Sequence, residues 1–103
     1  MDARIIGAGS TLPGDTKWQA YSGTTSGIFV DVDTSSAGFT RTPVYVASIA
    51  GISDHWATTG GSAIYCPTAK GFRVYVRFAM GQPLTPRFAN QKHWQINWVG
   101  VES

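Results

Sequence analysis

The chain has 103 residues, the length of a single domain, and its composition argues against helical architectures. Strong helix formers are scarce, with only two Leu and one Glu. By contrast there are fifteen Val and Ile, eleven Thr and thirteen aromatic residues, which favour strands. A helical bundle, a coiled coil and a doubly wound α/β fold are therefore disfavoured. Charged residues make up 14% of the chain, against about 25% in an ordinary soluble domain.

The charge pattern argues against two classes of partner. Eight Lys and Arg and six Asp and Glu are scattered along the chain and give a net charge of +2. Because no basic run exists, we expect no binding to nucleic acid. No apolar stretch approaches the roughly 18 residues needed to span a bilayer, so we expect no membrane insertion.

The sequence gives little information on localisation. Residues 1–7 are too short and polar for a signal peptide, and the single Cys66 excludes an intrachain disulfide. Cytoplasmic folding is the simplest expectation, with secretion as a mature chain or by a non-classical route as the alternative.

Turn residues divide the chain into short segments, as an all-β domain requires. We predict a single β-sandwich domain over residues 1–103, in which residues 1–16 form an N-terminal arm and loop. Within it we expect six antiparallel strands, at residues 17–21, 28–33, 43–49, 62–66, 71–79 and 94–101. Turns are expected at residues 22–27, 34–38 and 67–70, and longer loops at residues 51–61 and 81–93.

Two strands carry the clearest patterns. In residues 71–79, apolar side chains alternate with Arg73, Tyr75 and Arg77, so one face is apolar. In residues 94–101, both faces contain apolar side chains. Such a strand is typical of a central position, or of a face given to a partner chain.

Two short motifs resemble ligand-binding loops only in part. Residues 5–9 begin like a dinucleotide-binding turn, but Leu12 stands where its third glycine is needed, so we interpret them as a flexible arm. Asp31 and Asp33 begin like a calcium loop and share one strand face, which leaves a divalent cation as one possibility and a solvated face as the other.

The residues that could carry catalysis do not form a recognisable set. His55 and His93 are the only imidazoles, and Cys66 follows an apolar segment, where a buried, inert thiol is expected. Zinc would need two further ligands, and no nucleophile elbow is present. We therefore predict no enzyme activity, no metal and no cofactor.

Two loops are richer in flat rings and hydrogen-bonding groups than a scaffold needs. Sugars present an apolar C–H face and a rim of hydroxyls, and an aromatic ring with polar neighbours is suited to both. The alternative is that Trp56 and Trp94 cap the core and their neighbours are merely solvated. The candidate ligand-binding residues are Asp54, His55, Trp56, Thr58 and Thr59 in the first loop and Arg87, Asn90 and His93 in the second.

Three segments resemble a known family. Residues 38–49 (GFTRTPVYVASI) resemble the "F…PPVV…SI" strand entry of the H-type lectins, the snail agglutinin and discoidin C-terminal family. Residues 71–76 (GFRVYV) resemble the "GF" strand of that family, and residues 94–102 (WQINWVGVE) resemble its closing "sISWIsIE" strand. The resemblance covers about two-thirds of the chain.

The resemblance implies a six-stranded antiparallel sandwich that assembles as a trimer, or as a hexamer of two trimers. Such lectins bind galactose-type sugars, above all N-acetylgalactosamine, in clefts between protomers. This sequence departs from the family in its loops. The segment 81–92 is an insertion, and His93-Trp94 reverses the order of the family's Trp-His pair and stands at a strand start.

We therefore expect a non-enzymatic, homo-oligomeric protein that binds glycans through the two loops. The alternative is a structural or assembly module, such as a trimeric fibre head or a particle subunit, that uses the same aromatic loops for protein contacts. A third hypothesis, a pore-forming or membrane-surface protein, is suggested only by the four Trp and lacks an amphipathic basic segment.

Overall fold

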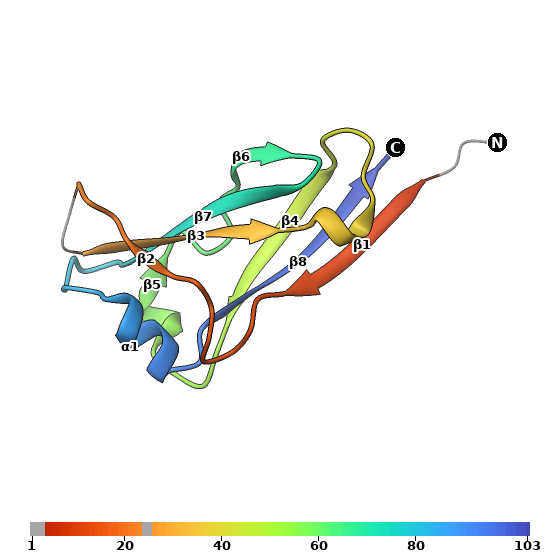
Figure 1. Cartoon of the computed structure of the whole chain (residues 1–103). Coiled ribbons are helices and arrows are strands. Elements are labelled where there is room, and N and C mark those ends of the chain that lie inside the picture. The colour runs from red at the N-terminus through yellow and green to blue at the C-terminus, as the bar shows by residue number, and fades with distance from the viewer. Residues whose placement is uncertain (1–3, 24–25) are drawn as a thin grey trace.

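Two antiparallel sheets pack face to face in a computed structural model of the chain, which describes residues 4–23 and 26–103 (Figure 1). One sheet has the strand order β1-β8-β4. The other has the order β2-β3-β7-β5, with β6 also paired to β7. The elements are β1 (Ile5–Ser10), β2 (Gln19–Ala20), β3 (Gly27–Asp33), η1 (Ser35–Ala37), β4 (Val44–Ala50), η2 (His55–Ala57), β5 (Thr58–Thr59), β6 (Tyr65–Thr68), β7 (Gly71–Phe78), α1 (Pro86–Gln91) and β8 (Gln95–Glu102).

The expected mostly-β sandwich is confirmed at this level: two antiparallel sheets of three and five strands form a compact β-sandwich-like domain with one short helix. The predicted count of six strands is too low, because the described residues form eight. Neither α1 nor any other helix in residues 4–23 and 26–103 is long and apolar enough to cross a membrane.

Alternating side chains from both sheets form the core between them. Every second residue of β3, β7 and β8 points inward, as the sequence pattern of β7 and β8 predicts. As expected for a strand with two apolar faces, β8 is the central strand of its sheet. The core side chains of these strands are Ile28, Val30, Val32, Phe72, Val74, Val76, Ile96 and Trp98.

The prediction of an N-terminal arm and loop at residues 1–16 is wrong for residues 5–10, because β1 pairs with β8 along its whole length. Its glycines lie where core rings approach the backbone. A Cβ at Gly7 would come 2.5 Å from the Cβ of Ala37, and one at Gly9 would come 3.0 Å from Nε1 of Trp98. These glycines therefore let the strand pack closely on the core and do not mark a flexible arm.

Two other predicted strands differ in extent. The strand expected at 17–21 is reduced to the two residues of β2, and the one expected at 62–66 is moved to β6. The register of β6 is irregular between Tyr65 and Thr68, where Cys66 has a positive φ of 51°. Cys66 is exposed, so the expectation of a buried thiol is wrong. Part of the predicted turn at 22–27, namely residues 24–25, lies outside the described residues.

The helix α1 was not expected within the loop at 81–93. Its N-terminus has a local signal, since the Thr85 hydroxyl accepts a hydrogen bond from the Phe88 amide at 3.1 Å and Pro86 occupies the first turn. The helix is short, with six residues, and packs Ala89 into the core. Too few apolar positions recur in such a segment for its periodicity to reveal it.

Glu102 ties the end of β8 to the segment before β4. Its carboxylate accepts hydrogen bonds from the Thr40 amide and hydroxyl, both at 2.7 Å, and from the Arg41 amide at 3.1 Å. The Thr40 hydroxyl has the largest effect and, together with the two amides, holds the pKa of Glu102 below its usual value of 4.5. The ionised carboxylate is therefore the form that stabilises the fold.

We expect Glu102→Gln to lower the free energy of unfolding near neutral pH, because the amide cannot accept these three bonds as a carboxylate does. Because the pKa of Glu102 is lower in the folded state, the carboxylate stabilises the fold fully at pH values above its unfolded-state pKa. This stabilisation is lost as the pH falls through the folded-state pKa. Urea denaturation at about pH 7 and about pH 3 should therefore show a gap between wild type and variant that shrinks in acid. A gap of equal size at both pH values would contradict this role.

Candidate functional site

The two loops predicted to bind ligand lie side by side, at the end of the molecule opposite the C-terminus (Figure 1). The Ile52 amide donates to the Lys92 carbonyl at 2.9 Å, and the indole Nε1 of Trp94 donates to the Ser53 carbonyl at 2.8 Å. Lys92 also forms an ion pair with Asp54, with Nζ 3.3 Å from Oδ2. The fold therefore joins segments about forty residues apart in sequence.

The two tryptophans of these loops have opposite environments. Trp94 is fully buried and contacts the rings of Phe78 and Phe88 edge-on, so its capping role in the core is confirmed. Trp56 lies on the η2 turn with 88% of its surface exposed. The core-capping alternative therefore fails for Trp56, whose ring is open to a ligand.

The three candidates from the second loop are spread over different surroundings. The Asn90 side chain accepts from the Thr16 amide at 3.1 Å and donates to the Thr16 carbonyl at 3.0 Å, so it holds the loop before β2. Arg87 is exposed on α1. The imidazole of His93, a residue with a φ of 55°, lies beside Gly14.

Asn90 has a structural role that Arg87 lacks. We expect Asn90→Ala to lower the free energy of unfolding by about 1–3 kcal/mol, because it leaves the backbone amide of the buried Thr16 unpaired. It also removes one of the two hydrogen bonds that the Thr16 carbonyl accepts, the other of which comes from the Trp18 amide at 2.8 Å. Arg87→Ala on the same helix is the matched control and should change stability by less than about 0.5 kcal/mol. Thermal or urea denaturation measures both, and equal effects would contradict the assignment.

The first loop borders a hollow of about 350 Å³ between the edge of β4 and β5, which we call the hydroxyl hollow. Three of the predicted residues, His55, Thr58 and Thr59, line it. Asp54 and Trp56 are their neighbours in the chain, but neither lines it. The complete lining is Ser48, Ile49, His55, Thr58, Thr59, Gly60, Gly61 and Ser62.

Polar groups of the hydroxyl hollow differ in their availability. The Thr58 hydroxyl donates to the His55 carbonyl at 2.6 Å, which fixes the η2 turn. The Nδ1 atom of His55 is buried and has no hydrogen-bond partner within the described structure. A buried imidazole nitrogen without a partner carries a desolvation cost.

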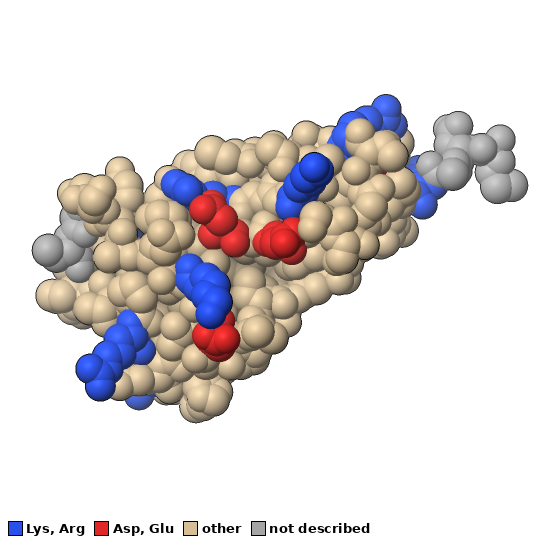
Figure 2. Space-filling model, in the orientation of Figure 1, with Lys and Arg blue, Asp and Glu red and all other residues tan. Residues whose placement is uncertain are grey.

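The hydroxyl hollow contains no Asp, Glu, Lys or Arg among its lining residues. The wider surface is similarly poor in charge. On the face shown in Figure 2, basic and acidic side chains lie interspersed and most of the surface is uncharged. This environment favours a neutral ligand with hydroxyl or amide groups over a phosphate or a nucleic acid.

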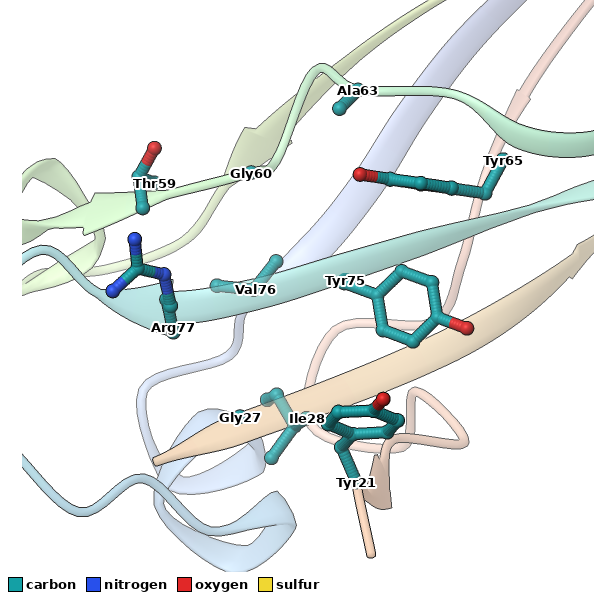
Figure 3. Close-up of a pocket in the computed structure, with 10 residues that line it drawn as sticks. All are labelled: Tyr21, Gly27, Ile28, Thr59, Gly60, Ala63, Tyr65, Tyr75, Val76 and Arg77. Carbon is teal, nitrogen blue, oxygen red and sulfur yellow. The ribbon is translucent and has the colours of Figure 1, made fainter. Parts of the chain in front are cut away.

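A second hollow, of about 530 Å³, lies on the outer face of the five-stranded sheet (Figure 3). We call it the tyrosine hollow, because Tyr21, Tyr65 and Tyr75 form one end of it while Arg77 stands at the other. Its lining is Tyr21, Gly27, Ile28, Thr59, Gly60, Ala63, Tyr65, Tyr75, Val76 and Arg77. Thr59 and Gly60 therefore border both hollows.

Asp31 and Asp33, the possible cation ligands, have hydrogen-bond partners within the protein. Asp31 accepts two hydrogen bonds from the Arg73 guanidinium, at 2.7 and 3.0 Å, and these bonds lower the pKa of Asp31. The Asp33 carboxylate accepts from the Ser35 amide at 2.9 Å. Within residues 4–23 and 26–103, no group of three or more His, Cys, Asp or Glu side chains is placed to hold a metal ion.

Sequence reasoning missed part of each hollow. Ser48 and Ser62 flank the predicted first loop, but only the approach of β4 to β5 brings them to His55. Tyr75 and Arg77 carried a signal, since both lie on the non-core face of the alternating strand β7. The other walls come from chain segments whose proximity no local pattern indicates.

No protein-family model matches the chain, and no curated protein matches it in sequence. The resemblance to the H-type lectins therefore stays a prediction based on the motifs quoted above.

Proposed function

We propose that this protein is a multivalent carbohydrate-binding protein that holds a neutral sugar in the hydroxyl hollow. The observation that carries the proposal is the chemistry of this hollow, whose lining combines His55 with the hydroxyl-bearing Ser48, Thr59 and Ser62 and contains no Asp, Glu, Lys or Arg. Sugar hydroxyls both donate and accept hydrogen bonds, so they complement this lining. Galactose-type sugars, including N-acetylgalactosamine, are the ligands that the family resemblance suggests.

Trp56 supplies the apolar contact that sugar binding needs. Its ring is 88% exposed and lies on the same η2 turn as His55, which borders the hydroxyl hollow. An exposed indole offers a flat face for the C–H groups of a pyranose. The Asp54 carboxylate on this loop is paired with Lys92 of the second loop and keeps further acceptor positions for a hydroxyl. In this proposal no residue acts as a catalyst, and the protein only binds.

Self-association would multiply this site. The outer face of the β1-β8-β4 sheet has an apolar end, where Ile6, Val44 and Val46 are 66%, 72% and 61% exposed. Val101 lies between Ile6 and Val44 in the strand register, and Val99 lies next to Val46. A continuous exposed apolar patch is typical of a protein interface. We propose that copies of the chain associate through this patch as a trimer or hexamer, which raises avidity by about 10²–10⁴.

The same patch supports the alternative function, a structural module of a fibre or particle. In that case the exposed Trp56 and Ile52 (88% and 68% exposed) would contact another protein in place of a sugar. The two functions differ in glycan binding, which only the first requires.

We expect Trp56→Ala to lower binding to galactose-type glycans on an array by about tenfold or more, because the sugar loses its stacking surface. Ile52→Ala is the matched control, since it removes another exposed apolar side chain of the same loop. Both variants should keep the oligomeric state of the wild type. Undiminished binding by Trp56→Ala would exclude this ring from the site, and the absence of glycan binding by the wild type would favour the assembly module.

We expect Val44→Lys to shift the protein from oligomer to monomer, because a charge is introduced into the proposed interface while the 72% exposed position leaves the core unchanged. Sedimentation velocity measures the change. Gln19→Lys, on the exposed β2 strand of the other sheet, is the control and should keep the wild-type mass. An unchanged mass for Val44→Lys would show that the patch is not the interface.

A further inference from the structure

The tyrosine hollow is a second concave site that the neutral sugar does not use. Its volume of about 530 Å³ falls in the range of about 300–1,000 Å³ typical of small-molecule sites. Tyr75 is flanked edge-on by Tyr21 and Tyr65, with ring centroids 5.5 and 5.0 Å away. Both flanking rings are partly exposed, at 43% and 49%, so they present free faces as well as hydroxyl groups.

The strand registers create this hollow. β5 and β6 pair with different ends of β7, at Arg77 and at Arg73, and the chain between them crosses Tyr75. That crossing is close, because a Cβ on Gly60 would lie 2.2 Å from the Tyr75 carbonyl oxygen. On the other side of β7, Gly27 pairs with Arg77 and has no side chain to fill the space. The hollow is therefore a product of the backbone arrangement.

The two arginines of β7 on this face differ in their partners. Arg73 is paired bidentately with Asp31, and its guanidinium lies 4.2 Å from the centroid of the Phe29 ring. Arg77 is exposed at the end of the hollow (Figure 3), and in the described part of the chain no carboxylate forms an ion pair with it. One positive charge beside aromatic rings is therefore open to an anionic ligand group.

We propose that the tyrosine hollow binds a sugar ring that carries a carboxylate. The ring C–H groups pack on Tyr21 and Tyr65, the carboxylate pairs with Arg77, and the remaining hydroxyls bond to the Tyr and Thr59 hydroxyls. This inference rests on the proposed function in taking the ligand to be a glycan. Because Thr59 and Gly60 border both hollows, a glycan with a neutral sugar next to an acidic one would occupy the two together.

Trigalacturonic acid and its fully methyl-esterified form are matched probes, because they differ only in charge and in the ester methyl groups. Each is titrated into the ¹⁵N-labelled protein and followed by amide chemical shifts. We expect the acid to shift amides around Tyr65, Tyr75 and Arg77 and to bind about tenfold or more tightly than the ester. Added salt should weaken binding of the acid and leave that of the ester unchanged.

Variants distinguish the contribution of the Arg77 charge to affinity from that of the Tyr65 ring contact. Arg77→Gln should lower affinity for the acid to that for the ester, whereas Arg41→Gln, which removes another exposed arginine away from the hollow, should not. Tyr65→Ala should weaken binding of both probes, and Tyr65→Phe should retain the ring contribution. The spectrum of each variant reports whether it is folded, and Arg77→Gln carries the test by itself if Tyr65→Ala unfolds.

The outcomes distinguish this inference from the proposed function. Equal affinity for acid and ester, or an acid affinity unchanged by Arg77→Gln, would overturn the inference even if neutral glycans bind at Trp56. Acid binding that requires Arg77 while Trp56→Ala leaves all neutral glycan binding intact would support the tyrosine hollow and exclude Trp56 from the neutral-sugar site. No shift of any amide by either probe at millimolar concentration would also overturn the inference.

Discussion

The burial of Trp94 is the constraint on which the site end of this molecule depends. Its indole nitrogen holds the Ser53 carbonyl at 2.8 Å, and its own carbonyl accepts from the indole of Trp18 at 3.2 Å. Its ring also contacts Phe78 of β7 and Phe88 of α1. The fully buried Trp94 thus connects the first loop, α1, β7 and the segment before β2. Because Trp94 fixes the backbone of the first loop at Ser53, the loop keeps its conformation while Trp56 remains exposed.

The outward faces of the two sheets differ in polarity. On the three-stranded sheet, the exposed valines of β4 form an apolar patch suited to association with another copy. On the five-stranded sheet, Arg73 is neutralised by Asp31, whereas Arg77 is left to face the tyrosine hollow. Arg77 is the one charged residue among those that line this hollow, so no neighbouring charge in the lining competes with it for an anionic group. In the proposed function, a neutral and an acidic sugar would bind side by side on this one domain.

The sequence predicted the long strands well and the short or glycine-rich elements poorly. β3, β4, β7 and β8 were found because alternating apolar residues report burial directly. β1 was missed because two of its inward positions, Gly7 and Gly9, are glycines, and only the Ala37 and Trp98 side chains packed over them explain why no side chain is present there. Three predicted ligand-binding residues of the first loop, His55, Thr58 and Thr59, line one hollow in the structure. Asn90 of the second loop instead bonds to the backbone of Thr16, a role that no local pattern indicates.

The composition and the alternation of apolar and polar residues by themselves determined that this is a β protein with few charged residues, since both can be read from the amino-acid sequence without any long-range contact. They also located a loop with an aromatic residue and hydrogen-bonding neighbours. Only the tertiary structure decided which rings are available, because Trp56 and Trp94 look alike in sequence and differ in the atoms packed around them. The tertiary structure alone also assembled the tyrosine hollow. Its three tyrosines come from β6, β7 and the residue after β2, and they meet through long-range strand pairing.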